Sequence, residues 1–194
     1  KIVLLAGSVH KDEDVRIVDA FSQAQKRRGE LVMIIAPRHM DRVEEINKRC
    51  LQHGLETCRR TTIQAGSHWT VLILDTLGEL ASLYAICDAA LLGGSLIPWG
   101  GQNLLEPAYY GKPLFFGPHM YNFKALSELF VENGAAQVIQ DEEELSDLLV
   151  AITEEKMSDM GIRAKETLQS LRGATDKTLE VLEKMIITDT RSDC

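Results

Sequence analysis

The sequence lacks the long apolar run that a membrane-spanning helix requires. No stretch approaches the roughly 18 consecutive apolar residues that cross a bilayer, and the first residues lack the layout of a signal peptide. We therefore expect a chain that neither spans a membrane nor enters secretion by itself. The four cysteines contain no Cys-x-x-Cys pair, which argues against a zinc site and a disulfide framework and favours free thiols.

Several motifs of nucleotide-binding enzymes are also missing. No Gly-x-Gly-x-x-Gly follows the first apolar run, which argues against a dinucleotide oxidoreductase, and no P-loop motif is present. No Asp-x-Asp pair stands at the end of a predicted strand, so a clamp for a metal and a diphosphate is not expected.

Basic residues are too few to balance the acidic ones, and their distribution is uneven. The chain has 21 Lys and Arg against 29 Asp and Glu, for a net charge of -8. This acidity argues against nucleic acid as a partner, since that affinity comes mainly from neutralising phosphates. Residues 1–60 nevertheless carry 12 Lys and Arg against 9 Asp and Glu, so this part can attract a small anion.

Short apolar runs rich in Val, Ile and Leu alternate with longer segments of helical periodicity. Strands are predicted near Ile2–Ala6, Leu31–Ala36, Val71–Leu74, Ala89–Leu92, Pro113–Phe116 and Ala136–Ile139. Helices are predicted near Glu13–Arg28, Arg42–His53, Gly78–Cys87, Leu104–Tyr110, Phe123–Asn133 and Glu142–Thr153. This alternation predicts an α/β fold, a doubly wound, Rossmann-like parallel sheet covered on both faces.

The composition divides the chain into a core and a helical end. We assign residues 1–140 to a Rossmann-like binding core and residues 141–194 to C-terminal helices of the same domain. The helical stretch is expected to reach about Lys184, with breaks at Gly161 and Gly173, before a frayed tail from Thr188 to Cys194.

Glycines and polar residues follow directly after the predicted strands. They are Gly7–His10, Pro37–His39, Asp75–Glu79, Gly93–Ser95 with Gly100–Pro107, and Gly117–His119. In an open α/β sheet these segments gather at one rim, where ligands bind. Glycine brings backbone N–H groups close to an anion, Ser8 and Ser95 add hydroxyls, and Arg38 offers a fork of donors that fits a phosphate. An ionised Glu106 only accepts hydrogen bonds, which suits a ribose diol.

Structural roles would also explain several of these residues. Two capping boxes fit the sequence, at Asn103-x-x-Glu106 and Thr76-x-x-Glu79. Arg38 could form a surface ion pair, and the acidic run 142–144 is typical of a solvated first helical turn. Trp99 could line a ligand pocket or simply cover the edge of the sheet.

Taken in order, these motifs resemble those of the 3-deoxy-D-manno-octulosonic acid (Kdo) transferases of bacterial lipopolysaccharide synthesis. The resemblance extends from residue 1 to about residue 140. It rests on Gly7–His10, Pro37–His39, Asp75–Leu80 with Tyr84 and Asp88, Gly93–Ser95, Gly100–Pro107, and Gly117–His119 with Asn122 and Phe123.

The resemblance implies one half of a GT-B glycosyltransferase, in which two Rossmann-like domains face each other. The chain looks like the C-terminal, donor-binding domain, and its start at Lys1 without an initiator Met suggests a piece of a longer protein. The implied reaction transfers Kdo from CMP-Kdo to a lipid A precursor, with inversion at the anomeric carbon and without a metal. CMP-Kdo is a substrate of this reaction, so no cofactor is implied. The acceptor and the catalytic base would belong to the missing N-terminal domain, so no catalytic residue is assigned here. The whole enzyme would act at the cytoplasmic face of the inner membrane, whereas this piece would be soluble.

The resemblance also implies a donor site. Its residues would be Ser8, Arg38, His39, Thr76, Leu77, Gly78, Glu79, Gly93, Gly94, Ser95, Asn103 and Glu106, with Gln102, His119 and Asn122 as further candidates. Arg38 and His39 would face the phosphate and the sugar carboxylate, and the 93–95 loop would hold the phosphate. The 76–79 segment would lie along the cytosine, and Asn103 and Glu106 would meet the ribose. Many relatives have His in the position of Gln102; Gln102 keeps the ability to hydrogen-bond but has no ionisable group, so we do not expect it to transfer a proton.

Two other functions are compatible with the same residues. Another GT-B enzyme, a UDP-sugar transferase or a UDP-sugar 2-epimerase, would share the glycine-rich loop and the ribose-binding Glu. A non-catalytic nucleotide-binding module would share the fold, and this chain would then be the entire protein.

Overall fold

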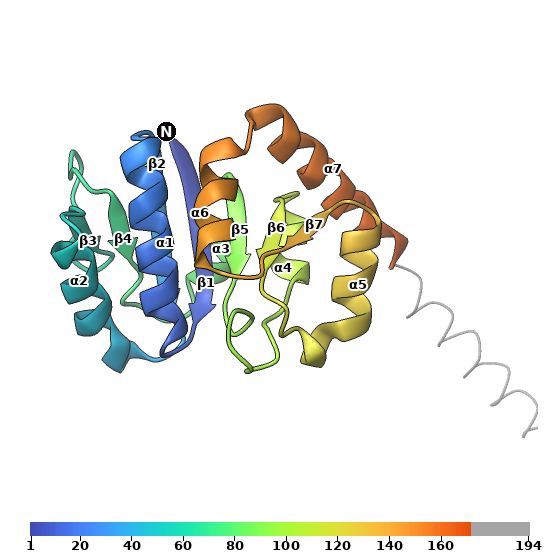
Figure 1. The fold of residues 1–194 in the computed structure, drawn as a ribbon, viewed down its shortest axis with the longest axis horizontal. Helices are drawn as coiled ribbons and strands as arrows, with labels where there is room; N and C mark the ends of the chain where they lie inside the picture. Colours follow the sequence, from blue (N-terminus) through green and yellow to red (C-terminus); the bar gives the residue numbers. More distant parts are fainter. Residues whose placement is uncertain (172–194) are drawn as a thin grey trace, which may run out of the picture.

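One sheet of seven parallel strands forms the centre of the structure (Figure 1). The structure is a computed structural model that describes residues 1–171. The strands are β1 (Ile2–Val9), β2 (Leu31–Pro37), β3 (Thr57–Arg59), β4 (Val71–Ile73), β5 (Ala89–Leu92), β6 (Leu114–Phe116) and β7 (Ala136–Val138). Their order is β3-β4-β2-β1-β5-β6-β7. Because the order reverses between β1 and β5, the predicted doubly wound α/β fold is confirmed.

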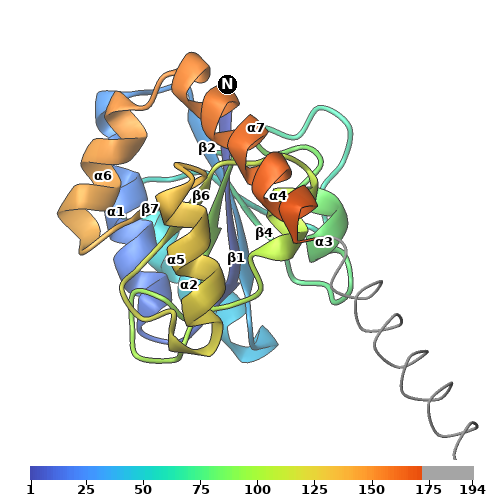
Figure 2. The same ribbon diagram turned by 90° about the vertical axis from the view of Figure 1, so that its right-hand side faces the viewer.

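Helices cover both faces of the sheet. They are α1 (Glu13–Arg27), α2 (Val43–Gln52), α3 (Leu80–Leu83), α4 (Leu105–Tyr109), α5 (Lys124–Glu132), α6 (Glu142–Ala151) and α7 (Glu154–Ser170), with 3-10 turns at Met40–Arg42 and Tyr121–Phe123. Figure 2 shows α1 and α6 on one side of the sheet and α3 and α4 on the other. In β1, Leu4 packs with the apolar cluster on the α1 side and Leu5 with the opposite cluster. A strand buried on both faces needs a continuous apolar run, which is the signal that predicted it.

Among residues 1–153, two elements differ from the prediction, while the other predicted strands and helices are confirmed to within three residues at each end. The strand β3 escaped prediction because it is a three-residue edge strand, Thr57-Cys58-Arg59, with no apolar run. The helix predicted at Gly78–Cys87 is wrong in extent, since α3 covers only Leu80–Leu83. Gly78 holds the chain in the left-handed region before it (φ 83°), and tight turns follow, with Ile86 N–H donating to Leu83 O (3.1 Å).

The described part of the C-terminal segment packs on the rest of the domain. Leu145 and Leu149 of α6 are buried in the cluster on the α1 side of the sheet. The predicted break at Gly161 is wrong, because this residue lies inside α7. The predicted break at Gly173, the helical stretch to Lys184 and the tail from Thr188 to Cys194 lie outside the described residues.

Gly161 is required by packing. A β-carbon at this position would overlap the carbonyl oxygen of Gly111. The absence of a side chain therefore lets α7 lie directly on the backbone that leads from α4 into β6.

None of the helices in residues 1–171 combines the length and the hydropathy needed to cross a bilayer. Cys50, Cys58 and Cys87 carry free thiols, as predicted, and Cys194 lies outside the described residues.

We predict that Gly161→Ala destabilises the protein by about 1–3 kcal/mol, the usual cost of overpacking. In an open helix the same change stabilises by up to about 1 kcal/mol, so the sign itself tests the packing. The measurement is the free energy of unfolding in urea. Ser158→Ala on the exposed face of α7 is the control and should stay within about 0.5 kcal/mol of the parent chain. A Gly161→Ala chain as stable as the parent would contradict the close approach to Gly111.

Candidate functional site

The segments singled out by the sequence meet at the carboxyl ends of the strands, the lower edge of the sheet in Figure 1. His10 is their point of contact. Its ring stacks on Trp99 with centroids 4.8 Å apart, and it meets the ring of His39 edge to face at 6.1 Å. The amide nitrogen of Gln102 lies 3.0 Å from His10 Nε2. The segments that follow β1, β2 and β5 therefore converge where the strand order reverses, which is where this fold binds ligands.

The surroundings of the His10 ring favour its neutral form. Only 7% of the residue is exposed. Burial, and then the charges of His39 and Arg38, lower the pKa of His10 below its ordinary value. Because the amide nitrogen of Gln102 only donates, His10 Nε2 accepts, and the ring proton lies on Nδ1. His10 was absent from the predicted donor set, although its segment was recognised.

Arg38 and His39 are exposed at this rim, as a ligand-binding role requires. The backbone N–H of Arg38 donates to Val9 O (2.7 Å), which fixes the segment beside the end of β1. Within residues 1–171 the Arg38 guanidinium forms no ion pair, so the alternative of a surface ion pair in that part of the chain is wrong.

A buried carboxylate holds the glycine-rich loop after β5. Glu13, at the start of α1, is 0% exposed and accepts hydrogen bonds from the backbone N–H groups of Gly94 (2.6 Å), Ser95 (2.9 Å) and Leu96 (2.9 Å). It also accepts from His10 N–H (3.3 Å). Burial raises the pKa of Glu13, and these four N–H groups act in the opposite direction. Sequence reasoning missed this residue, which lies 81 positions or more from the loop that it binds.

The 93–95 loop, which we predicted to hold the phosphate, uses its backbone N–H groups within the protein. The N–H groups of Gly94 and Ser95 are taken by Glu13, and that of Gly93 donates to Gly7 O (2.8 Å). Ser95 is 0% exposed, and its hydroxyl donates to Leu92 O (2.5 Å) and accepts from Gly117 N–H (2.8 Å). The glycines serve close backbone packing, because a β-carbon on Gly93 would overlap the carbonyl group of Ser8.

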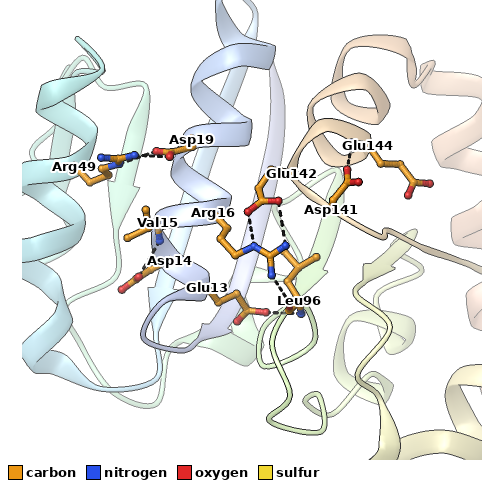
Figure 3. A network of polar contacts seen from close by, with 10 residues as sticks. All are labelled: Glu13, Asp14, Val15, Arg16, Asp19, Arg49, Leu96, Asp141, Glu142 and Glu144. Atoms are coloured by element: carbon orange, nitrogen blue, oxygen red, sulfur yellow. Dashed lines mark hydrogen bonds and ion pairs between the residues drawn. The ribbon is translucent and has the colours of Figure 1, made fainter.

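A second contact from α1 fixes the same loop (Figure 3). The Arg16 guanidinium donates to Leu96 O (2.5 Å) and to both carboxylate oxygens of Glu142 in α6. The expectation of a solvated first turn at 142–144 is therefore wrong for Glu142. That turn is also capped, since Asp141 accepts from the N–H of Glu144 (2.9 Å).

The segment after β4 forms its own polar cluster. Glu79 accepts hydrogen bonds from the hydroxyl of Thr76 and from Arg60 Nη2 (2.9 Å), and these contacts lower its pKa. The predicted capping box at Thr76 and Glu79 is wrong, because the two side chains bond each other and no side chain caps α3. Leu77 is 78% exposed and Gly78 is exposed beside it, so an open apolar surface remains at the rim.

Asn103 and Glu106 are both exposed at the start of α4. The Asn103 side chain accepts from Leu105 N–H (3.0 Å) rather than from Glu106, so the predicted capping box does not form. No hydrogen bond or ion pair engages the Glu106 carboxylate in the described part of the chain.

The other candidates have structural contacts or none. The Asn122 amide donates to Trp99 O (3.3 Å) and supports the loop after β5, and His119 is tied through its backbone N–H to Ser95 O (3.0 Å). Ser8 sits at an irregularity of β1 with a positive φ of 53°. In the described residues no group of three His, Cys, Asp or Glu side chains is arranged to hold a metal ion.

We compared the chain with protein-family models, with curated proteins and with solved structures. No protein-family model matches the chain. The 3-deoxy-D-manno-octulosonic acid transferases of Bordetella pertussis and Haemophilus influenzae are 32% and 30% identical, each over 93% of this chain and 44% and 43% of their own lengths. The chain thus spans less than half the length of these relatives. The crystal structure of the C-terminal CMP-Kdo binding domain of WaaA from Acinetobacter baumannii matches with a TM-score of 0.77 and 30% identity, over 87% of this chain and 90% of that one.

We predict that Glu13→Gln destabilises the protein by about 2–4 kcal/mol, because an amide group cannot accept from all four N–H donors and turns its own N–H₂ toward them. The free energy of unfolding in urea measures the effect. Glu143→Gln, at an exposed position, is the control and should change stability little. Equal stability of the two variants would contradict the anchoring role of Glu13.

We predict that His10 titrates below its ordinary pKa of about 6.5 and that Trp99→Ala raises its pKa, because the stacked indole helps to bury the ring. As the pH falls, His10 is protonated at a higher pH in the unfolded chain than in the folded protein. The stability contributed by His10 is therefore present above about pH 6.5 and is lost as the pH falls below it. Glu79 and Glu142, whose pKa values are lowered, lose their contributions to stability only below about pH 4.5. The measurement is the ring-proton chemical shift of His10 against pH. An unchanged pKa in Trp99→Ala would contradict this origin of the shift.

Proposed function

The chain belongs to the 3-deoxy-D-manno-octulosonic acid (Kdo) transferase family, and we propose that it acts as the family's donor-binding domain, with CMP-Kdo held at the rim between β1 and β5. The observation that carries the proposal is the convergence of His10, Arg38 and His39 where the strand order reverses.

The phosphate of the donor is bound by side chains. Arg38 and His39 are exposed, and the N–H groups of the 93–95 loop are already used by the protein. A guanidinium supplies a planar fork of donors for phosphate or carboxylate oxygens. CMP-Kdo carries both groups close together, so one cationic edge can orient the phosphate and the sugar carboxylate.

The nucleoside lies toward α3 and α4. The exposed side chain of Leu77 offers an apolar surface for the base, whereas the Glu79 carboxylate is occupied by Thr76 and Arg60. Asn103 and the Glu106 carboxylate, which has no partner in residues 1–171, meet the ribose, because a carboxylate accepts hydrogen bonds from a diol.

The complete enzyme transfers Kdo to a lipid A precursor at the cytoplasmic face of the inner membrane, with inversion and without metal or cofactor. The acceptor and the catalytic base belong to the other domain, since a base must lie within hydrogen-bond reach of the acceptor hydroxyl. The contribution of this domain is to position the donor and to stabilise the departing CMP through Arg38. The described residues thus form part of a complete site, and the chain alone is inactive.

We predict that the 194-residue chain binds CMP saturably and that Arg38→Ala and Glu106→Ala each weaken the binding by about 10-fold or more, the loss of one charge-assisted hydrogen bond. Calorimetric titration measures the affinity, and competition with UMP tests the base. Arg27→Ala is the matched control, because Arg27 pairs with Asp147 (2.6 Å) at the far end of α1 and should not affect binding. Absence of CMP binding at millimolar concentration, or preference for UMP, would overturn the proposal.

A further inference from the structure

Trp99 is an exposed tryptophan whose backbone the surrounding loops hold in place. It lies in the connection between β5 and α4, and 58% of the residue is exposed. Its carbonyl oxygen accepts a hydrogen bond from the Asn122 side chain (3.3 Å). The carbonyl oxygens of the residues before and after it accept from the Tyr121 hydroxyl (2.8 Å) and from the Asn122 N–H (3.1 Å). The backbone at Trp99 is therefore fixed on both sides.

The indole ring of Trp99 has one covered face and one exposed face. The ring is stacked on the buried ring of His10, with centroids 4.8 Å and planes 18° apart. Gly94 lies against the same pair, because a β-carbon on Gly94 would come within 3.2 Å of the His10 ring and 3.4 Å of the Trp99 β-carbon. Covering His10 uses one side of the indole, so the exposed surface of Trp99 belongs mainly to the opposite side.

Two hydrogen-bond donors lie beside this aromatic surface. His39 meets the His10 ring edge to face, with centroids 6.1 Å apart, so His39 and Trp99 contact the same buried ring. His39 and its neighbour Arg38 are both exposed. The three side chains of Trp99, Arg38 and His39 thus form a small patch that combines an apolar aromatic face with a guanidinium and an imidazole.

The connection that carries Trp99 passes from one side of the sheet to the other. Leu96 is buried in the cluster on the α1 side, and Leu104, directly before α4, is buried in the opposite cluster. The proposed nucleoside contacts lie toward α3 and α4, whereas Trp99 contacts His10, which stands between β1 and α1. A donor whose nucleoside lies near α4 and whose phosphate meets Arg38 therefore brings its sugar toward Trp99.

We propose that Trp99 recognises the sugar of the donor, which stacks on the exposed face of the indole and places its carboxylate at Arg38 and His39. The proposal rests on the proposed function and adds a residue that selects the sugar. The C–H groups of a pyranose ring form an apolar face that packs on an aromatic ring, and a carboxylate needs donors. An acidic sugar has both features, whereas a neutral sugar lacks the group that the donors bind.

Trp99→Leu tests the proposal, because leucine still covers His10 but has no ring on which a sugar can stack. In calorimetric titrations of the 194-residue chain, CMP should bind within about twofold of the parent affinity, whereas CMP-Kdo should bind about 3- to 10-fold more weakly. Trp99→Phe keeps an aromatic face and should retain more of the affinity for CMP-Kdo. Glu106→Ala gives the contrast, since the ribose is common to both ligands and both affinities should fall by the same factor.

Fluorescence gives an independent readout, because the chain has two tryptophans. Trp69→Phe leaves Trp99 as the remaining one and should not change the affinity for either ligand. In this variant CMP-Kdo should shift the emission to shorter wavelength, since the sugar displaces water from the indole. CMP lacks this sugar and should leave the emission unchanged.

Three results would refute the sugar contact while CMP binding by the parent chain leaves the proposed function standing. One is a Trp99→Leu chain that binds CMP-Kdo as the parent does. Another is a Trp99→Leu chain that loses the same factor for CMP and CMP-Kdo, because Trp99 would then shape the site or contact the nucleotide. The third is an emission of Trp99 that CMP-Kdo does not change. If the parent chain binds neither ligand, both proposals fail.

Discussion

The arrangement of the rim depends on one buried carboxylate. Glu13 ends the turn between β1 and α1, and it accepts four backbone N–H groups, three of them from the loop after β5. Burying a charged group costs several kcal/mol, and charge-assisted hydrogen bonds of about 1.5–3 kcal/mol each offset that cost. Because β1 and β5 are the strands between which the order reverses, this contact fixes the geometry of the point where a ligand binds. Arg16 fastens the same loop to α6.

This constraint decides which groups remain for a ligand. A glycine-rich loop with N–H groups pointing inward is a good anion site, and here the anion is the carboxylate of Glu13. In the donor site that we propose, recognition of the phosphate therefore passes to side chains, and Arg38 is the exposed cation beside His10 and His39. Side chains can reorient around a ligand, whereas the anchored loop keeps its shape and supports them.

The apolar periodicity of the sequence predicted the main strands and helices, and the ends of the strands predicted where the polar segments gather. β1, β2 and β5 are apolar runs buried on both faces, and their carboxyl ends carry the segments that meet at His10. Contacts between distant residues could not be predicted. A motif such as Gly93-Gly94-Ser95 reads the same whether its N–H groups bind a phosphate or Glu13, and the capping pattern at Asn103 and Glu106 fits a helix start whose side chains do not form that cap. β3 was not predicted, and α3 was predicted too long, because three or four residues contain too few turns of any period to be distinctive.

Hydrogen-bond satisfaction separates supporting groups from recognising ones at this rim. Glu13 and Glu79 are acids with two or more donors each, and their contacts complete the fold. Within residues 1–171, the exposed Glu106 carboxylate and Arg38 guanidinium have no hydrogen-bond or ion-pair partner. Polar groups that a rigid scaffold holds without hydrogen-bond partners are stabilised when a ligand supplies those partners. An acceptor and a cation left in this state suit the diol and the phosphate of the nucleotide that we propose as the ligand.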